Sequence, residues 1–147
     1  MRFMMFMIPQ VYQSEGAAGK ETLQDFHPDA EAVSAMMKYN EELAKAGALI
    51  ALDGLHPSSK GARVKFSGGK PSVTDGPFVE SKEVVGGYWM IDVQSKQQAI
   101  EWAKGCPAGP GDVIEIRQVF EVSEFPPDVQ KAAENPVVQT EIEKHKK

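Results

Sequence analysis

Two segments of this chain have apolar side chains on both faces of an extended strand, and no other feature limits the fold as strongly. In residues 2–8, Phe3, Met5 and Met7 alternate with Met4, Phe6 and Ile8. In residues 84–93, Trp89 and Ile91 point to one side, and Tyr88 and Met90 point to the other. A strand that is apolar on both faces must be covered on both. The two segments therefore predict central strands of a sheet that is packed on both sides.

Helix signals lie between and after these strands. Asp29 has the character of an N-cap and Gly47 that of a helix end, so we predict a helix between them. Its apolar stripe consists of Val33, Met36, Met37, Leu43 and Ala44. Ser95, with Gln98 three residues later, has the capping-box pattern and opens a second helix that runs through Lys104.

Shorter strands complete the pattern. Residues 48–52 and 113–120 are predicted as strands, and residues 62–66 and 72–74 as a small hairpin joined across two glycines. The order is then β-α-β-(hairpin)-β-α-β. It predicts an α+β fold, a ferredoxin-like βαββαβ antiparallel sheet with both helices on one face and an inserted β-hairpin.

This arrangement leaves one face of the sheet without helices. Because the central strands are apolar on that face as well, we expect a second copy of the chain to cover it, and two-fold dimers are the commonest oligomers. We therefore predict a homodimer. Its domain spans residues 1–122, and the polar, Pro-interrupted residues 123–147 form a C-terminal arm.

Charge and cysteine content narrow the partners and the compartment. The net charge of −5 argues against a nucleic-acid partner, which needs a basic surface for phosphates. Cys106 is the only cysteine, so no internal disulfide is possible. The apolar start stops at Pro9, short of the roughly 7–15 apolar residues of a secretory signal, and no run reaches the ~20 residues of a membrane span. We expect a soluble, cytoplasmic protein with no membrane or nucleic-acid partner.

Residues 74–89 (TDGPFVESKEVVGGYW) carry the most specific motif in the chain. They resemble the signature of the YCII-related proteins, in particular the DGPF-domain branch. The resemblance continues through residues 54–59, 101–103 and 115–117, and it covers roughly residues 2–122. It implies the dimeric α/β-barrel form of the ferredoxin-like fold. Members of this branch mostly lack an assigned reaction, and some are encoded beside extracytoplasmic-function sigma factors.

The chain departs from its better-understood relatives at one position. Those relatives look like enzymes that use a His–Asp pair, with the histidine on the first helix about three turns before its terminal glycine. Counting back from Gly47 reaches Met36 or Met37 here, and the predicted helix contains no histidine. The catalytic pair therefore does not carry over, and acid–base chemistry would need another histidine.

His56 and Asp75 are the candidate catalytic residues. His56 precedes Pro57 at the end of a predicted strand, and an ordinary histidine titrates near neutrality, which suits proton transfer. Asp75 opens an Asp-Gly-Pro turn, in which the glycine permits an unusual φ. We expect the hairpin between them to return the chain to the same sheet edge, so that Asp75 could orient His56. The alternatives are a surface or structural histidine and an aspartate that only shapes the turn.

Five further residues are candidates for binding a substrate: Phe78, Glu80, Lys82, Tyr88 and Arg117. The aromatic rings would close a cavity. Glu80 and Lys82 share one face of an extended segment and either orient a polar ligand or join an ion-pair network. Arg117 shares a strand face with Glu115 and either anchors an anionic group or pairs across the dimer.

No metal or cofactor is expected. The methionines near the start of the chain alternate with other apolar residues as core packing does. His27, His56 and His145 do not have the spacing of zinc ligands.

Two functional hypotheses remain. The first is a cofactor-independent enzyme, lyase- or isomerase-like, that acts on a small organic molecule in a pocket between sheet and helices. The second is a non-catalytic ligand-binding or regulatory dimer, such as a sigma-factor accessory. The missing helix histidine favours the second, and the polar residues at strand ends favour the first.

Overall fold

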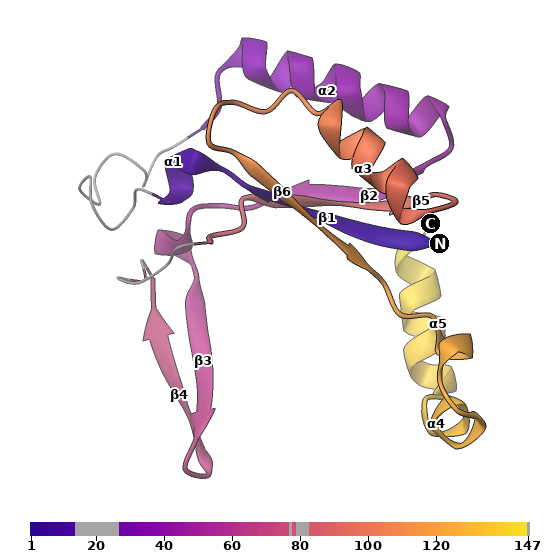
Figure 1. Cartoon of the computed structure of the whole chain (residues 1–147). Coiled ribbons are helices and arrows are strands. Elements are labelled where there is room, and N and C mark those ends of the chain that lie inside the picture. Colours follow the sequence, from indigo (N-terminus) through magenta and orange to yellow (C-terminus); the bar gives the residue numbers. More distant parts are fainter. Residues whose placement is uncertain (14–26, 77, 79–82, 147) are drawn as a thin grey trace.

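The computed structural model describes residues 1–13, 27–76, 78 and 83–146. The main strands are β1 (Arg2–Ile8), β2 (Leu49–Gly54), β5 (Gly87–Asp92) and β6 (Val113–Gln118). They form one sheet in the order β2-β5-β1-β6, and each neighbouring pair is antiparallel. Helices α2 (Ala30–Lys45) and α3 (Lys96–Lys104) lie on one face of this sheet (Figure 1). The architecture is therefore the mixed α+β type that the sequence predicts.

The remaining elements are short. They are α1 (Gln10–Gln13), β3 (Ala62–Ser67), β4 (Lys70–Asp75), α4 (Pro127–Ala132) and α5 (Pro136–His145), with single 3₁₀ turns at Ser58–Lys60 and Val122–Glu124. Strands β3 and β4 form a separate two-stranded hairpin, as predicted. Its turn uses Gly68 and Gly69, which both have positive φ.

The two central strands are β5 and β1, the segments that are apolar on both faces. Their helix-side residues form one buried core with the two helices. The core consists of Phe3, Met5, Tyr39, Leu43, Ala48, Trp89, Ile91, Val93 and Ala99. Burying each of the larger side chains stabilises the fold by on the order of 1.5–3 kcal/mol.

Tyr39 joins the two helices to the sheet. Its hydroxyl donates a hydrogen bond to the carbonyl oxygen of Trp102 on α3, at 2.7 Å. Its ring packs edge-on against both tryptophans, at centroid distances of 5.9 Å to Trp89 and 6.4 Å to Trp102. Burial raises the pKa of the Tyr39 hydroxyl, which keeps the hydroxyl protonated and able to donate this bond at neutral pH.

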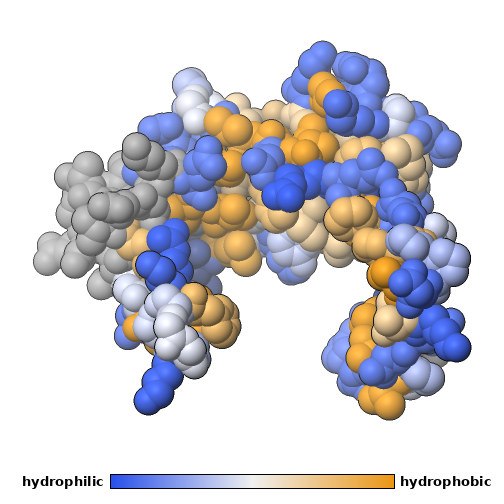
Figure 2. Space-filling view, turned by 60° about the horizontal axis from the view of Figure 1, so that its bottom comes forward, coloured by the Kyte–Doolittle hydropathy of each residue, from blue (hydrophilic) through white to orange (hydrophobic). Residues whose placement is uncertain are grey.

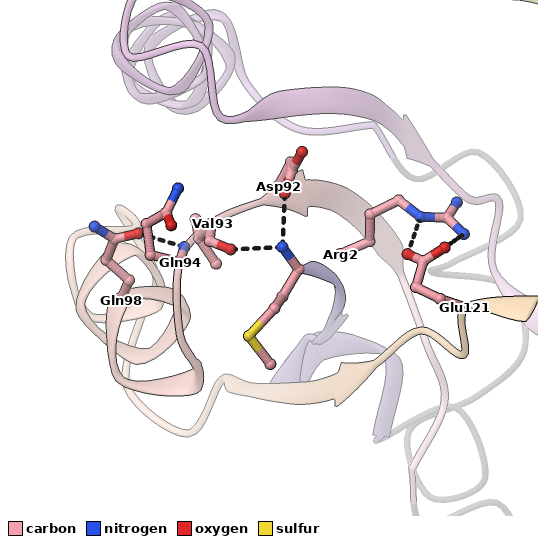
Figure 3. A network of polar contacts seen from close by, with 7 residues as sticks. Arg2, Asp92, Val93, Gln94, Gln98 and Glu121 are labelled. Carbon is pink, nitrogen blue, oxygen red and sulfur yellow. Dashed lines mark hydrogen bonds and ion pairs between the residues drawn. The ribbon is translucent and has the colours of Figure 1, made fainter. Parts of the chain in front are cut away.

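Both predicted helix caps are present. The Asp29 carboxylate accepts a hydrogen bond from the Ala32 amide at 2.7 Å, and the Ser95 hydroxyl accepts one from the Gln98 amide at 3.1 Å. The side chain of Gln98 returns to the amide of Gln94, one residue before the cap, at 2.8 Å (Figure 3). Both helices therefore begin where the sequence predicts.

Polar contacts hold the chain at the end of the sheet where β1 begins. The Arg2 guanidinium donates two hydrogen bonds to the Glu121 carboxylate, at 2.7 and 3.1 Å (Figure 3). These bonds lower the pKa of Glu121. Because Glu121 lies three residues after the end of β6, just before the C-terminal arm, the pair fixes the point at which the arm leaves the sheet.

Strand β5, which the sequence predicts over residues 84–93, starts later than predicted. Its ladder begins at Gly87 instead of residue 84. The Gln13 side chain takes the place of a neighbouring strand here, because it accepts from the Val84 amide at 2.9 Å and donates to the Val84 carbonyl at 3.0 Å.

The apolar stripe of α2 also differs from the prediction. The residues that pack inward are Met36, Tyr39, Asn40 and Leu43, and Val33, Met37 and Ala44 are exposed. Val33 and Met37 are 43% and 57% exposed. These two lie over a cavity, so they have no sheet side chains to pack against.

Two parts of the chain project from the sheet on the side away from α2 and α3 (Figure 1). One is the β3–β4 hairpin, in which every residue is exposed. The other is the C-terminal arm, whose helices α4 and α5 bury no residue. Between them lies the helix-free face of the sheet, called the open face below. Figure 2 turns this side towards the viewer and shows hydrophobic residues over the sheet between the two projections.

Gly76 at the base of the hairpin is needed for a reason other than the predicted one. Its φ is not in the left-handed region. A Cβ at this position would lie 1.7 Å from the Ser58 carbonyl oxygen, because the chain returns there and the Gly76 amide donates to the Gly61 carbonyl at 2.9 Å. The close backbone approach, and not an unusual φ, requires glycine.

We predict that Gly76→Ala destabilises the hairpin base by about 1–3 kcal/mol, the usual cost of overpacking. Denaturant unfolding and the hydrogen-exchange rate of the Gly61 and residue-76 amides measure this. Gly61→Ala is the matched control, because its Cβ would lie 3.5 Å from the same Ser58 oxygen, an ordinary contact. Equal behaviour of the two variants would contradict the close-approach explanation.

Candidate functional site

A cavity of about 320 Å³ lies between the N-terminal half of α2 and the sheet. This volume is at the lower end of the range for small-molecule sites, about 300–1,000 Å³. The residues that line it are Met7, Pro28, Ala32, Val33, Met36, Met37, Asn40, Leu52, Asp53, Gly54, Gly86, Gly87, Tyr88, Trp89 and Pro107. They come from β1, α2 and the residue Pro28 before it, the end of β2, the start of β5 and the loop after α3.

A pair of glycines makes the space. Gly54 and Gly87 lie opposite each other in the β2–β5 ladder, next to the pair Leu52–Trp89. Because side chains alternate along a strand, both glycine positions face the helix side, as Leu52 and Trp89 do. A Cβ at Gly54 would meet no atom within 4 Å. These two positions therefore offer no side chain to α2, and a void remains between the helix and the sheet there.

Asn40 is the polar side chain that reaches this cavity. The residue is only 5% exposed, and among the described residues that are buried it is the one with a polar side chain outside the hydrophobic core set. The Trp89 indole donates a hydrogen bond to Asn40 Oδ1 at 2.8 Å. Asn40 Nδ2 donates to the Met37 sulfur at 3.6 Å, and a thioether is a weak acceptor. The cavity thus contains a fixed amide whose N–H groups are only weakly satisfied.

Asp53 and Tyr88 border the cavity through their main chain. Each follows or precedes a helix-side residue, so alternation turns its side chain to the open face. There the Tyr88 hydroxyl donates to Asp53 Oδ2 at 2.6 Å. This hydrogen bond raises the pKa of Tyr88. Apart from Asn40, the described side chains that face the cavity are consequently apolar.

The two candidate catalytic residues lie elsewhere. His56 is exposed in the loop after β2, and Asp75 is exposed at the end of β4. Within the described ranges no hydrogen bond joins them, and neither lines the cavity. The hairpin returns the chain to the 3₁₀ turn at Ser58–Lys60, and it does not join the edge of the main sheet.

The candidate substrate-binding residues are dispersed. Phe78 is half-buried, and the Arg63 guanidinium carbon lies 4.0 Å from its ring centroid. Arg117 is exposed on β6, opposite Met4 in the ladder and on the open face. Of the three candidates that the structure describes, Tyr88 borders the cavity. Glu80 and Lys82 lie outside the described residues.

Sequence reasoning missed Asn40 and the paired glycines. Asn40 had a readable signal, because it falls on the apolar stripe of α2, four residues after Met36. A polar residue at such a position needs a hydrogen-bond partner inside the protein. The glycine pairing had no comparable signal, because it depends on the register of two strands that are far apart in sequence.

Three further features bear on function in the part of the chain that is described: metal ligands, membrane-spanning helices and the cysteine. No three His, Cys, Asp or Glu side chains there are grouped as metal ligands would be. None of the helices seen in it combines the length and the apolar character of a membrane span. The Cys106 sulfur lies 4.0 Å from the sulfur of Met36, and burial raises the pKa of its thiol to about 11.

Comparison with known proteins adds a family. Residues 1–123 match the sequence pattern of the YCII-related domain. A stretch of 60 residues is 37% identical to an uncharacterised protein of Rhizobium meliloti (strain 1021). That stretch covers 41% of this chain and 48% of the relative, so the chain spans about half of that protein's length.

We predict that Cys106 reacts slowly with iodoacetamide. The thiolate is the nucleophile, and a thiol with a pKa of about 11 holds about 100-fold less thiolate near pH 8 than one with the ordinary value of 9.0. The alkylation rate should therefore keep rising up to about pH 11. The chain unfolded in urea is the control, and Cys106 is the only thiol in the sequence. Equal rates for the folded and the unfolded chain would contradict this prediction.

Proposed function

The chain belongs to the YCII-related family, and from this premise we propose that it binds a small, largely apolar organic molecule in the cavity beneath α2. The observation that carries the proposal is the buried Asn40 amide, which faces an otherwise apolar cavity with weakly satisfied N–H groups. Ligand sites are typically apolar spaces with a few fixed polar groups of this kind.

We favour binding over acid–base catalysis in this cavity. Among its described lining residues, no titratable side chain faces the interior, because those of Asp53 and Tyr88 turn to the open face. Met36 and Met37 line it at the positions where the resemblance places the histidine of catalytic relatives. Proton transfer by His56 and Asp75 would need a separate site near the hairpin base. Membership of the DGPF branch is part of the proposal and is supported by residues 74–78, TDGPF.

We also propose that two copies pair through their open faces, as a dimeric α/β-barrel with a ferredoxin-like sheet. The strand order and the placement of both helices on one face support this fold. Alternation puts Met4 and Phe6 of β1 on the open face, beside Met90 and Tyr88 of β5. A central apolar surface of this kind needs cover, and a second identical face supplies it.

The two projections support the same dimer. An isolated two-stranded hairpin is only marginally stable in water, so this hairpin needs a packing partner. Phe66 near its tip is 81% exposed and offers an apolar contact for one. Val137 on α5 is 78% exposed. A two-fold axis that sets the hairpin of one copy beside the arm of the other would cover both exposed apolar surfaces.

We predict that Gly54→Leu abolishes ligand binding without unfolding the protein. The new side chain would enter open space, and β2 is an edge strand that tolerates it. The neutral dye N-phenyl-1-naphthylamine should brighten in the wild-type cavity and lose most of this signal in the variant. Ala35→Leu, on the exposed outer side of α2, adds the same apolar group away from the cavity and should bind as the wild type does. No dye binding by the wild type, or undiminished binding by Gly54→Leu, would count against the proposal.

For the dimer, sedimentation at micromolar concentration should give twice the chain mass of 16.1 kDa. Phe6→Arg should shift the protein to the monomer, because a charge would be buried without a partner at the centre of the interface. Ala35→Arg on the opposite side of the molecule should remain dimeric. A folded wild-type monomer under these conditions would overturn the dimer proposal.

A further inference from the structure

We infer that the cavity selects a neutral aromatic molecule with a carbonyl oxygen, which accepts a hydrogen bond from Asn40 Nδ2, over the corresponding carboxylate. This inference rests on the proposed ligand site and specifies the class of its ligand. It follows from three properties of the described lining residues: the orientation of one amide, the distribution of charge and the nature of the walls.

The orientation of the Asn40 amide is set by its neighbour. The indole N–H of Trp89 can only donate, so the atom 2.8 Å from it must be the amide oxygen. The amide nitrogen then takes the other position, from which it donates to the Met37 sulfur at 3.6 Å. An amide nitrogen has two N–H groups, so it can still donate a full-strength bond to a ligand oxygen. The site is therefore a donor site.

The charges around the cavity disfavour an anion. No Lys, Arg or His occurs among the lining residues that the structure describes. The N-terminus of α2 is already capped, because the Asp29 carboxylate accepts from the Ala32 amide. The Asp53 carboxylate lies on the open face of the sheet and is bonded there by Tyr88, so it does not face the cavity. A carboxylate ligand would lose its strong hydration without gaining a cation as a partner. A neutral carbonyl has less hydration to lose, and the hydrogen bond from Asn40 compensates for that loss.

The walls suit an aromatic ring. Met7, Met36 and Met37 contribute thioethers, and Trp89 contributes an indole. Methionine side chains are flexible and polarisable and pack favourably against aromatic groups. Val33 and Met37 are exposed at the same place, so the opening of the cavity is itself apolar. A small planar molecule with one acceptor satisfies both the walls and Asn40.

Three probes of similar size test the inference by equilibrium dialysis: 2-acetylnaphthalene, 2-isopropylnaphthalene and 2-naphthoate. We expect the ketone to bind the wild type about tenfold more tightly than the hydrocarbon, the usual net gain of one hydrogen bond. The naphthoate should bind more weakly than either. In Asn40→Asp the carboxylate can still accept from Trp89 but cannot donate, so the preference for the ketone should disappear. Asn135→Asp, at the cap of α5, is the matched control and should keep it.

The outcomes separate the inference from the proposal on which it rests. Equal wild-type affinities for ketone and hydrocarbon, both lost in Gly54→Leu, would keep the ligand site and overturn the role of Asn40. Tighter binding of naphthoate than of the ketone would overturn the charge argument. Failure of all three probes to bind would remove the ligand site together with the inference. The comparison of probes on the wild type needs no variant to fold.

Discussion

The structure depends on a mismatch between its two central strands and its two helices. β1 and β5 carry apolar side chains on both faces, but α2 and α3 cover only one. On the covered face Phe3, Met5, Trp89 and Ile91 form the core. On the open face Met4 and Phe6 lie beside Tyr88 and Met90. Burial of the first set builds the domain, and the half-buried second set forms the surface through which we propose that two copies pair.

The cavity arises within the covered face by a local failure of packing. α2 is long enough to pass over the end of the sheet where Gly54 and Gly87 are paired, and these residues offer it no side chain. Val33 and Met37 remain apolar there without a packing partner. Asn40 marks the boundary between core and cavity, because its oxygen is fixed by Trp89 in the core and its nitrogen contacts the sulfur of Met37, which lines the cavity. One residue thereby connects the packing of α2 to the chemistry of the site.

The sequence predicted correctly those features that depend on residues close together in the chain, and it failed where contacts between distant residues decide the structure. The caps at Asp29 and Ser95, the hairpin turn at Gly68–Gly69 and the central place of the doubly apolar strands were all predictable, because each depends on neighbouring residues or on simple alternation. The start of β5 was predicted too early, because a distant side chain, Gln13, replaces the ladder at Val84. The role of Gly76 was predicted for the wrong reason, because the atom that excludes a side chain belongs to Ser58.

The sequence by itself determined the elements, their order, which strands are central and the membership of the chain in its family. Local hydrogen bonds and the alternation of apolar side chains involve residues that are close together in the sequence, so sequence patterns predict them. The tertiary structure alone decided where a cavity forms, which residue reaches it and how far His56 and Asp75 stand from it. These depend on the register of β2 against β5 and on the separate sheet formed by the hairpin. Register and docking are set by contacts between residues distant in sequence, and no local pattern records them.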